Sequence, residues 1–134
     1  MKAVIDTNVI ISGLFWKVPP AGVLAAWVAK KFEWIVSADI LAEYHRTLQT
    51  LEAKYPPPAS AWSFLRGVTL SAKLTVPAEL EQQVCTDPDD DKFIAAAISG
   101  HADTIVSGDK ALLQVDGYRG LRIVKPASFL KILA

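Results

Sequence analysis

Residues 2–9, KAVIDTNV, set the pattern on which the fold prediction depends. The short apolar run Lys2–Ile5 is typical of a strand that is buried on both faces. Asp6 follows that run at once, and residues 9–15 then begin a helical or irregular segment. A short buried strand that leads into a helix is the unit that recurs along the rest of the chain.

The remaining segments alternate in the same way. Short apolar runs predict further strands, and segments with apolar residues three or four positions apart predict helices. We expect strands at 33–36, 73–76, 104–107 and 121–124, and helices at 21–31, 37–53, 59–70, 89–100, 109–115 and from 126 onward. This alternation favours an α/β fold with a mostly parallel central sheet.

Length and composition limit the classes of protein that fit. The 134 residues predict a single domain over 1–134, and 51% hydrophobic residues argue against disorder. Fourteen basic residues balance fourteen acidic ones, so a nucleic acid would have to be held by a local patch or by metal ions. The single cysteine, Cys85, and the lack of an apolar run of ~20 residues predict a cytoplasmic protein with no membrane span.

Two aspartates follow predicted strands. Asp6 comes directly after Ile5, and Asp109 follows Val106 by three residues. Ligands of parallel α/β sheets bind beyond the carboxyl ends of the strands, so we expect both acids at the same edge. Taken singly, an acidic residue after a strand is also common as plain solvated surface.

A denser group of acids opens the helix within residues 86–97, TDPDDDKFIAAA. At ~100° per residue, Asp91 shares a stripe with the apolar residues three, four and seven positions further on. That stripe should face the core. Asp87 and Asp89 are expected to cap the helix, where free N–H groups and the helix dipole favour carboxylates, and Asp90 is expected to lie to one side. We therefore predict that Asp91 is the carboxylate that faces inward.

A fourth acid, Glu43, lies on the border of the apolar face of the helix predicted at 37–53. Alone it would be a solvated edge residue, but with Asp6, Asp91 and Asp109 it predicts one convergent acidic pocket. Four carboxylates repel one another and resist desolvation, and divalent cations relieve both costs. Oxygen-rich sites suit Mg²⁺ or Mn²⁺, which can activate water and stabilise the leaving oxygen in phosphodiester cleavage.

Together, these motifs resemble the PIN-domain family of metal-dependent nucleases. They are residues 4–9 (VIDTNV), Glu43, residues 91–97 (DKFIAAA) and residues 105–109 (IVSGD). Their order and spacing span most of the chain. The chain looks like the small prokaryotic PIN proteins that are toxin components related to VapC-type toxins.

The resemblance implies a three-layer α/β/α sandwich and a Mg²⁺- or Mn²⁺-dependent ribonuclease that leaves a 5′-phosphate and a 3′-hydroxyl. It implies that the catalytic and metal-site carboxylates are Asp6, Glu43, Asp91 and Asp109, and that Asn8 and Ser107 are accessory polar residues. Many relatives carry threonine where Ser107 stands, so a hydroxyl is kept. The resemblance also implies a homodimer and leaves room for an antitoxin protein as partner.

Two other functions fit parts of the sequence. A phosphatase or phosphotransferase could use Asp6 as its nucleophile, but Asn8 stands where such a motif has its second acid. A catalytically dormant module that binds RNA or protein would not need all four acids. A metal-dependent assay on RNA and on a phosphate monoester separates the three interpretations.

Aromatic residues give a further prediction about RNA. Trp16 and Lys17 are the candidate RNA contacts, since an aromatic ring can stack on a base and an ammonium group can meet a phosphate. Trp27, Trp34 and Trp62 are interpreted instead as core or interface residues.

Overall fold

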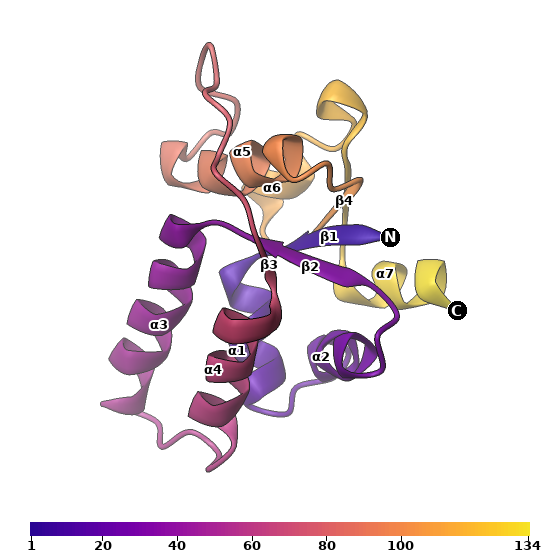
Figure 1. Cartoon of the computed structure of the whole chain (residues 1–134). Helices are drawn as coiled ribbons and strands as arrows, with labels where there is room; N and C mark the ends of the chain where they lie inside the picture. The colour runs from indigo at the N-terminus through magenta and orange to yellow at the C-terminus, as the bar shows by residue number, and fades with distance from the viewer.

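The centre of the molecule is a five-stranded sheet in which neighbouring strands are all parallel. The computed structural model describes residues 1–134. The strands are β1 (Lys2–Ile5), β2 (Glu33–Val36), β3 (Lys73–Leu74), β4 (Thr104–Val106) and β5 (Arg122–Val124). Their order across the sheet is β3-β2-β1-β4-β5, which places β1 in the middle (Figure 1).

Helices cover both faces of this sheet. They are α1 (Thr7–Leu14), α2 (Pro20–Val28), α3 (Ala38–Glu52), α4 (Ala61–Ser71), α5 (Asp91–Ser99), α6 (Lys110–Leu113) and α7 (Pro126–Leu133). α5 and α6 lie on one side and contact β1, β2, β4 and β5, while α1 to α4 and α7 lie on the other side (Figure 1). The fold is therefore the three-layer α/β/α sandwich that the sequence predicts.

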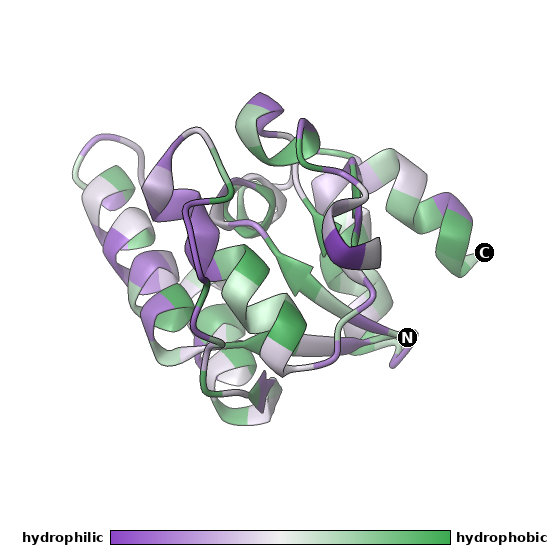
Figure 2. Ribbon diagram, turned by 90° about the horizontal axis from the view of Figure 1, so that it is seen from above, coloured by the Kyte–Doolittle hydropathy of each residue, from purple (hydrophilic) through white to green (hydrophobic).

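The core explains why the apolar runs form strands. Every residue of Ala3–Ile5 and of Thr104–Val106 is fully buried, because helices pack on both faces of these strands. Figure 2 shows hydrophobic residues on the strands at the centre and alternating polar and apolar residues on the helices around them. Trp34 of β2 is buried against Trp27 and Tyr44, with ring centroids 5.3 and 6.2 Å away. Truncating such an aromatic to alanine costs about 3–5 kcal/mol.

Two differences from the sequence prediction concern the segments on either side of the loop before α5. The strand predicted at 73–76 ends at Leu74, and the chain then runs as a long loop to the next helix. The helix predicted at 89–100 starts as a 3₁₀ turn, Pro88–Asp90, and becomes α-helical at Asp91. The carboxylate of Asp87 caps this turn by accepting the N–H of Asp89 at 2.9 Å. The tighter turn changes which acidic side chain faces which neighbour.

The helices also bear on the membrane prediction. No helix combines the length and the apolar character that a membrane span requires.

Candidate active site

The site is built around Asp6, which directly follows β1 and is 4% exposed. β1 and β4 pair so that Ile5 lies opposite Val106, which brings the next residues, Asp6 and Ser107, side by side. The buried hydroxyl of Ser107 donates a hydrogen bond to Asp6 Oδ2 at 2.7 Å. The backbone N–H of Asp109 donates in turn to Ser107 Oγ at 2.9 Å. One short chain of hydrogen bonds thus fixes the carboxyl ends of both strands.

Asp109 is half-buried and opens α6. Its Oδ1 accepts the N–H of Ala111 at 3.1 Å, so the same carboxylate caps the helix and lies beside Asp6 at the sheet edge. The negative charge of Asp109 raises the pKa of Asp6, as expected for two carboxylates that share one site. The prediction that Asp6 and Asp109 lie at one edge of the sheet agrees with this geometry.

Asp91 occupies a different place from the one predicted. Its Oδ1 accepts the N–H of Cys85 at 2.7 Å, and its Oδ2 accepts the N–H of Val84 at 3.0 Å. The same stripe of α5 meets the preceding loop again where Ala78 N–H donates to Ala95 O at 3.2 Å. The stripe does face the core at Ile94, but at its first residue both carboxylate oxygens of Asp91 hold loop backbone. Asp91 is thus occupied by the loop, and it is not among the charged groups that raise the pKa of Asp6.

Asp90 takes that place instead. Its pKa is raised to about 7, chiefly by burial and then by the charge of Asp109, a hydrogen bond with Asp109 and the charge of Asp6. Burial likewise raises the pKa of Asp6 to about 6, against the opposing effect of its hydrogen bond from Ser107. Asp6, Asp90 and Asp109 therefore act on one another as a group. Asp90 is the last residue of the 3₁₀ turn at 88–90, directly before α5 begins.

Glu43 lies at the border of this group. It projects from α3, accepts the hydroxyl of Thr7, and pairs with the ammonium group of Lys92 at 2.6 Å. Lys92 also reaches Asp89 at 3.1 Å, and its side chain is only 11% exposed. Glu43 raises the pKa of Asp6, so it is close enough to act on the pocket, but a cation already balances its charge. Lys92 lies within the motif at 91–97, but its position in the sequence predicts no role for it.

The donor set has the chemistry of a divalent cation site, although its geometry is open. No three His, Cys, Asp or Glu side chains lie close enough together to enclose an ion as they stand. The convergent side chains Asp6, Asp90 and Asp109 nevertheless offer only carboxylate oxygens, which hard cations such as Mg²⁺ prefer. Their mutual effect on pKa is the repulsion that such a cation would relieve. Asp6, Asp90 and Asp109 therefore fit a divalent cation, and Glu43 lies beside them.

A hollow of about 530 Å³ adjoins the acidic group. Asn8 and Gly108, which stand next to the site in sequence, line it together with Ser12 and Lys125. Asn8 is exposed, as an accessory residue that meets a ligand would be. Lys125 supplies a cation to this hollow, and no sequence motif pointed to it.

The two predicted RNA contacts lie elsewhere. Trp16 is 66% exposed at the end of α1, and Lys17 lines a separate hollow with Phe15 and Tyr55. α1 leads away from the carboxyl edge of the sheet (Figure 1), so the structure does not bring Trp16 or Lys17 to the carboxylates. Their exposure is compatible with a ligand contact at a distance from the reaction.

The sequence was compared with protein families and with curated proteins. No curated protein matches it. A family model described as PIN domain matches residues 2–111, a stretch that includes all the acids of the site and the sheet edge that carries them. PIN domains are generally nucleases that cleave phosphodiester bonds and use divalent metals. The match covers most of the chain and agrees with the fold and with the acidic edge, so this protein belongs to the PIN-domain family.

Proposed function

We propose that the protein is a Mg²⁺- or Mn²⁺-dependent endoribonuclease, which cleaves internal phosphodiester bonds of RNA. The observation that carries the proposal is the group formed by Asp6, Asp90 and Asp109, in which Ser107 holds Asp6 and the two other acids raise the pKa of Asp90. These residues come from three separate segments and meet at the carboxyl edge of a parallel sheet, where such folds bind ligands.

The residues have distinct tasks in the proposed reaction. A bound divalent cation supplies positive charge that activates water and stabilises the leaving oxygen. Asp6, Asp90 and Asp109 would hold it, and Ser107 orients Asp6 through its hydrogen bond. Lys92 balances Glu43, so that the fourth carboxylate remains in place beside the others.

The proposed chemistry is a single displacement at phosphorus. A water oxygen bonds to the phosphorus while the bond from phosphorus to the 3′-oxygen breaks. The water loses a proton, and the leaving 3′-oxygen gains one. The products are a 5′-phosphate and a 3′-hydroxyl. The groups of the protein must be ionised for this step, which sets its dependence on pH.

We further propose that the protein is the toxin component of a toxin–antitoxin system related to VapC-type toxins. The likeness of its motifs and its small size support this role. The role implies a cytoplasmic homodimer that an antitoxin protein binds. Sedimentation at several concentrations would check the dimer, and a monomer at micromolar concentration with full activity would contradict it.

One experiment tests the reaction itself. The purified protein is incubated with a labelled RNA, and separately with a phosphate monoester, in the presence of EDTA, Mg²⁺ or Mn²⁺. We expect internal RNA cleavage with metal only, no monoester hydrolysis, and loss of cleavage in Asp6→Asn. Monoester hydrolysis without RNA cleavage would favour the phosphatase that uses Asp6. Metal-independent RNA binding without cleavage would favour the dormant module.

A further inference from the structure

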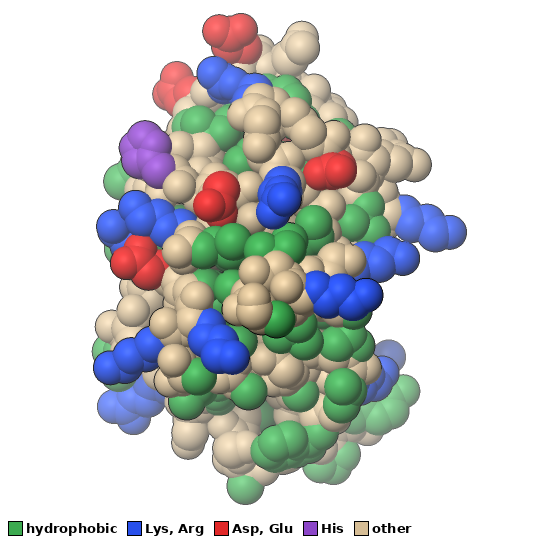
Figure 3. Space-filling view, turned by 90° about the vertical axis from the view of Figure 1, so that its right-hand side faces the viewer, with side chains coloured by type: hydrophobic (Ala, Val, Ile, Leu, Met, Phe, Trp, Pro, Cys, Tyr) green, Lys and Arg blue, Asp and Glu red, His purple; other side chains and the backbone are tan.

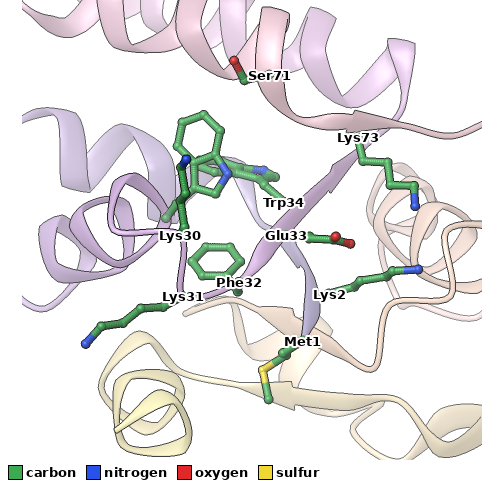
Figure 4. Close-up of a pocket in the computed structure, with 10 residues that line it drawn as sticks. Met1, Lys2, Lys30, Lys31, Phe32, Glu33, Trp34, Ser71 and Lys73 are labelled. Atoms are coloured by element: carbon green, nitrogen blue, oxygen red, sulfur yellow. The ribbon is translucent and has the colours of Figure 1, made fainter.

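A second hollow lies at the opposite edge of the sheet, where β1, β2 and β3 begin. Its volume is about 630 Å³. Four lysines line it: Lys30 and Lys31 from the turn after α2, Lys2 from β1 and Lys73 from β3 (Figure 4). Segments that are far apart in the chain thus bring four ammonium groups to one concave surface. We call this surface the basic hollow.

Protein carboxylates do not balance the charge of the basic hollow. The ion pairs of the chain both involve Lys92, so none of the four lysines has a carboxylate within 4.0 Å. Glu33 is the one acid in the lining, and Figure 4 shows it between Lys2 and Lys73. Four positive charges and one negative charge leave the hollow with a net charge of +3. Lys and Arg side chains are spread over this side of the molecule (Figure 3).

The floor of the basic hollow is aromatic. Phe32 and Trp34 are buried beneath it, and the half-buried Trp27 packs against Trp34 with an interplanar angle of 81°. Trp27 therefore keeps part of its ring at the surface while its position is fixed by the core. A positive groove with a fixed aromatic ring is the combination that binds single-stranded nucleic acid, because lysines meet phosphates and the ring meets a base.

The acidic residues gather at the opposite edge of the sheet from the basic hollow. The neutral chain concentrates half of its fourteen acidic residues at or beside the carboxyl edge: Asp6, Glu43, Asp87, Asp89, Asp90, Asp91 and Asp109. A polyanion is repelled there until metal is bound, and it needs an attractive surface elsewhere. A four-residue strand is about 13 Å long at ~3.3 Å per residue, so the two edges are within reach of one short RNA segment.

We propose that the basic hollow binds single-stranded RNA and anchors the substrate outside the acidic pocket. The proposal rests on the proposed function in one respect, namely that RNA is the substrate. Binding in the hollow requires neither metal nor the carboxylates of the pocket. It can therefore be measured when cleavage is switched off.

The test compares two charge-matched double variants. Binding of a fluorescently labelled single-stranded oligoribonucleotide is followed by anisotropy in EDTA over a series of salt concentrations. The test variant is Lys2→Gln with Lys73→Gln. The control is Lys54→Gln with Lys131→Gln, two exposed lysines outside the hollow. We expect the test variant to bind about tenfold or more weakly and the control to bind like the wild type.

The salt dependence gives a second readout. Each phosphate contact to a single strand contributes about −0.7 to the slope of log K against log salt. Loss of two contacts should therefore make the slope less negative by about 1.4. Circular dichroism checks that the variants fold, and Lys30→Gln with Lys31→Gln replaces the test variant if it does not fold.

Each outcome decides the proposal. Wild-type affinity and slope in the folded hollow variant would overturn it, as would lack of RNA binding by the wild type in EDTA. Inorganic phosphate or a mononucleotide that competes as well as RNA at equal concentration would also overturn it, since the hollow would then be a small-anion site. RNA that binds in the hollow and is never cleaved with metal would overturn the proposed nuclease function and leave the hollow proposal intact.

Discussion

The carboxylate of Asp91 holds the backbone of Cys85 through a hydrogen bond of 2.7 Å, and its second oxygen holds Val84. Asp91 is thus the anchor of the loop that precedes α5, while Asp90, one position earlier, belongs to the acidic pocket. The two neighbouring aspartates therefore have separable tasks.

We expect Asp90→Asn to lower metal-dependent RNA cleavage by about 10²-fold or more, because it removes a charge from the group that stabilises the transition state. The fold should persist, since the repulsion among the carboxylates falls. Cleavage rates measured beside Asp89→Asn provide the control, because Asp89 faces Lys92 and solvent. Equal rates for the two variants would show that Asp90 has no role in the pocket.

Asp91→Ala should act mainly on stability. The change leaves the N–H groups of Val84 and Cys85 without their acceptor, which costs about 1–3 kcal/mol for a buried group. Urea unfolding would measure the loss, and proteolysis would show whether cleavage begins in the 75–87 loop. A variant as stable as the wild type, with an equally resistant loop, would contradict the anchoring role.

Ser107→Ala should shift the pH dependence of cleavage. Burial raises the pKa of Asp6 and the Ser107 hydroxyl lowers it, with a net pKa of about 6, so loss of the hydroxyl should raise that pKa further. The acidic limb of the kcat/KM profile should then move to higher pH. Ser107→Thr keeps a hydroxyl and serves as the control, with a profile near that of the wild type. An unchanged profile in the alanine variant would separate Ser107 from the ionisation of Asp6.

Stability without metal should fall as pH rises from about 4 to about 7. Burial raises the pKa of Asp6 from 3.8 to about 6 and that of Asp90 from 3.8 to about 7. Over this range the folded protein binds more protons than the unfolded chain, so unfolding becomes easier with rising pH. Thermal unfolding in EDTA should show the fall, and Asp6→Asn should show a smaller one. Mg²⁺ should restore stability most at the higher pH, and a wild-type stability that rises across this range would refute the prediction.

Lys92→Met should destabilise the protein by about 1–3 kcal/mol, because it leaves the half-buried Glu43 without its cation. The double variant Lys92→Met, Glu43→Gln should recover part of that loss, since the unpaired charge is then gone. Chemical unfolding of the wild type, both single variants and the double variant gives the coupling free energy. A coupling near zero would mean that the pair contributes little to the fold.

The parts of the fold that local sequence determines were predictable. The apolar runs that became β1 and β4 are buried on both faces, and the carboxylate that follows each of them lies at one edge, as their parallel pairing requires. The choice between Asp90 and Asp91 was not predictable from helical periodicity. It depends on a 3₁₀ turn and on the N–H groups of a loop, both of which form only when the chain is folded.

The roles of Lys92 and Lys125 were not predictable from the sequence for a similar reason. Lys92 and Glu43 are 49 positions apart in the chain, and Lys125 and Asn8 line one hollow although they come from opposite ends of the chain. Lys92 stands within the motif at 91–97 and Lys125 stands in none, yet neither position in the sequence gives the lysine a role. The role of each lysine depends on the residues that surround it in the folded protein.

The strand order has a consequence for how this site can change. From β1 the chain crosses toward β2 on one side of the sheet, and from β4 it crosses toward β5 on the other, so α1 and α6 leave the sheet in opposite directions (Figure 1). The two connections separate at the point where Asp6 and Ser107 meet, the topological switch point at which doubly wound sheets open a crevice. The cleft thus comes from the winding of the chain and needs no dedicated lid, so the loops around it can change to suit new substrates while the carboxylates keep their place.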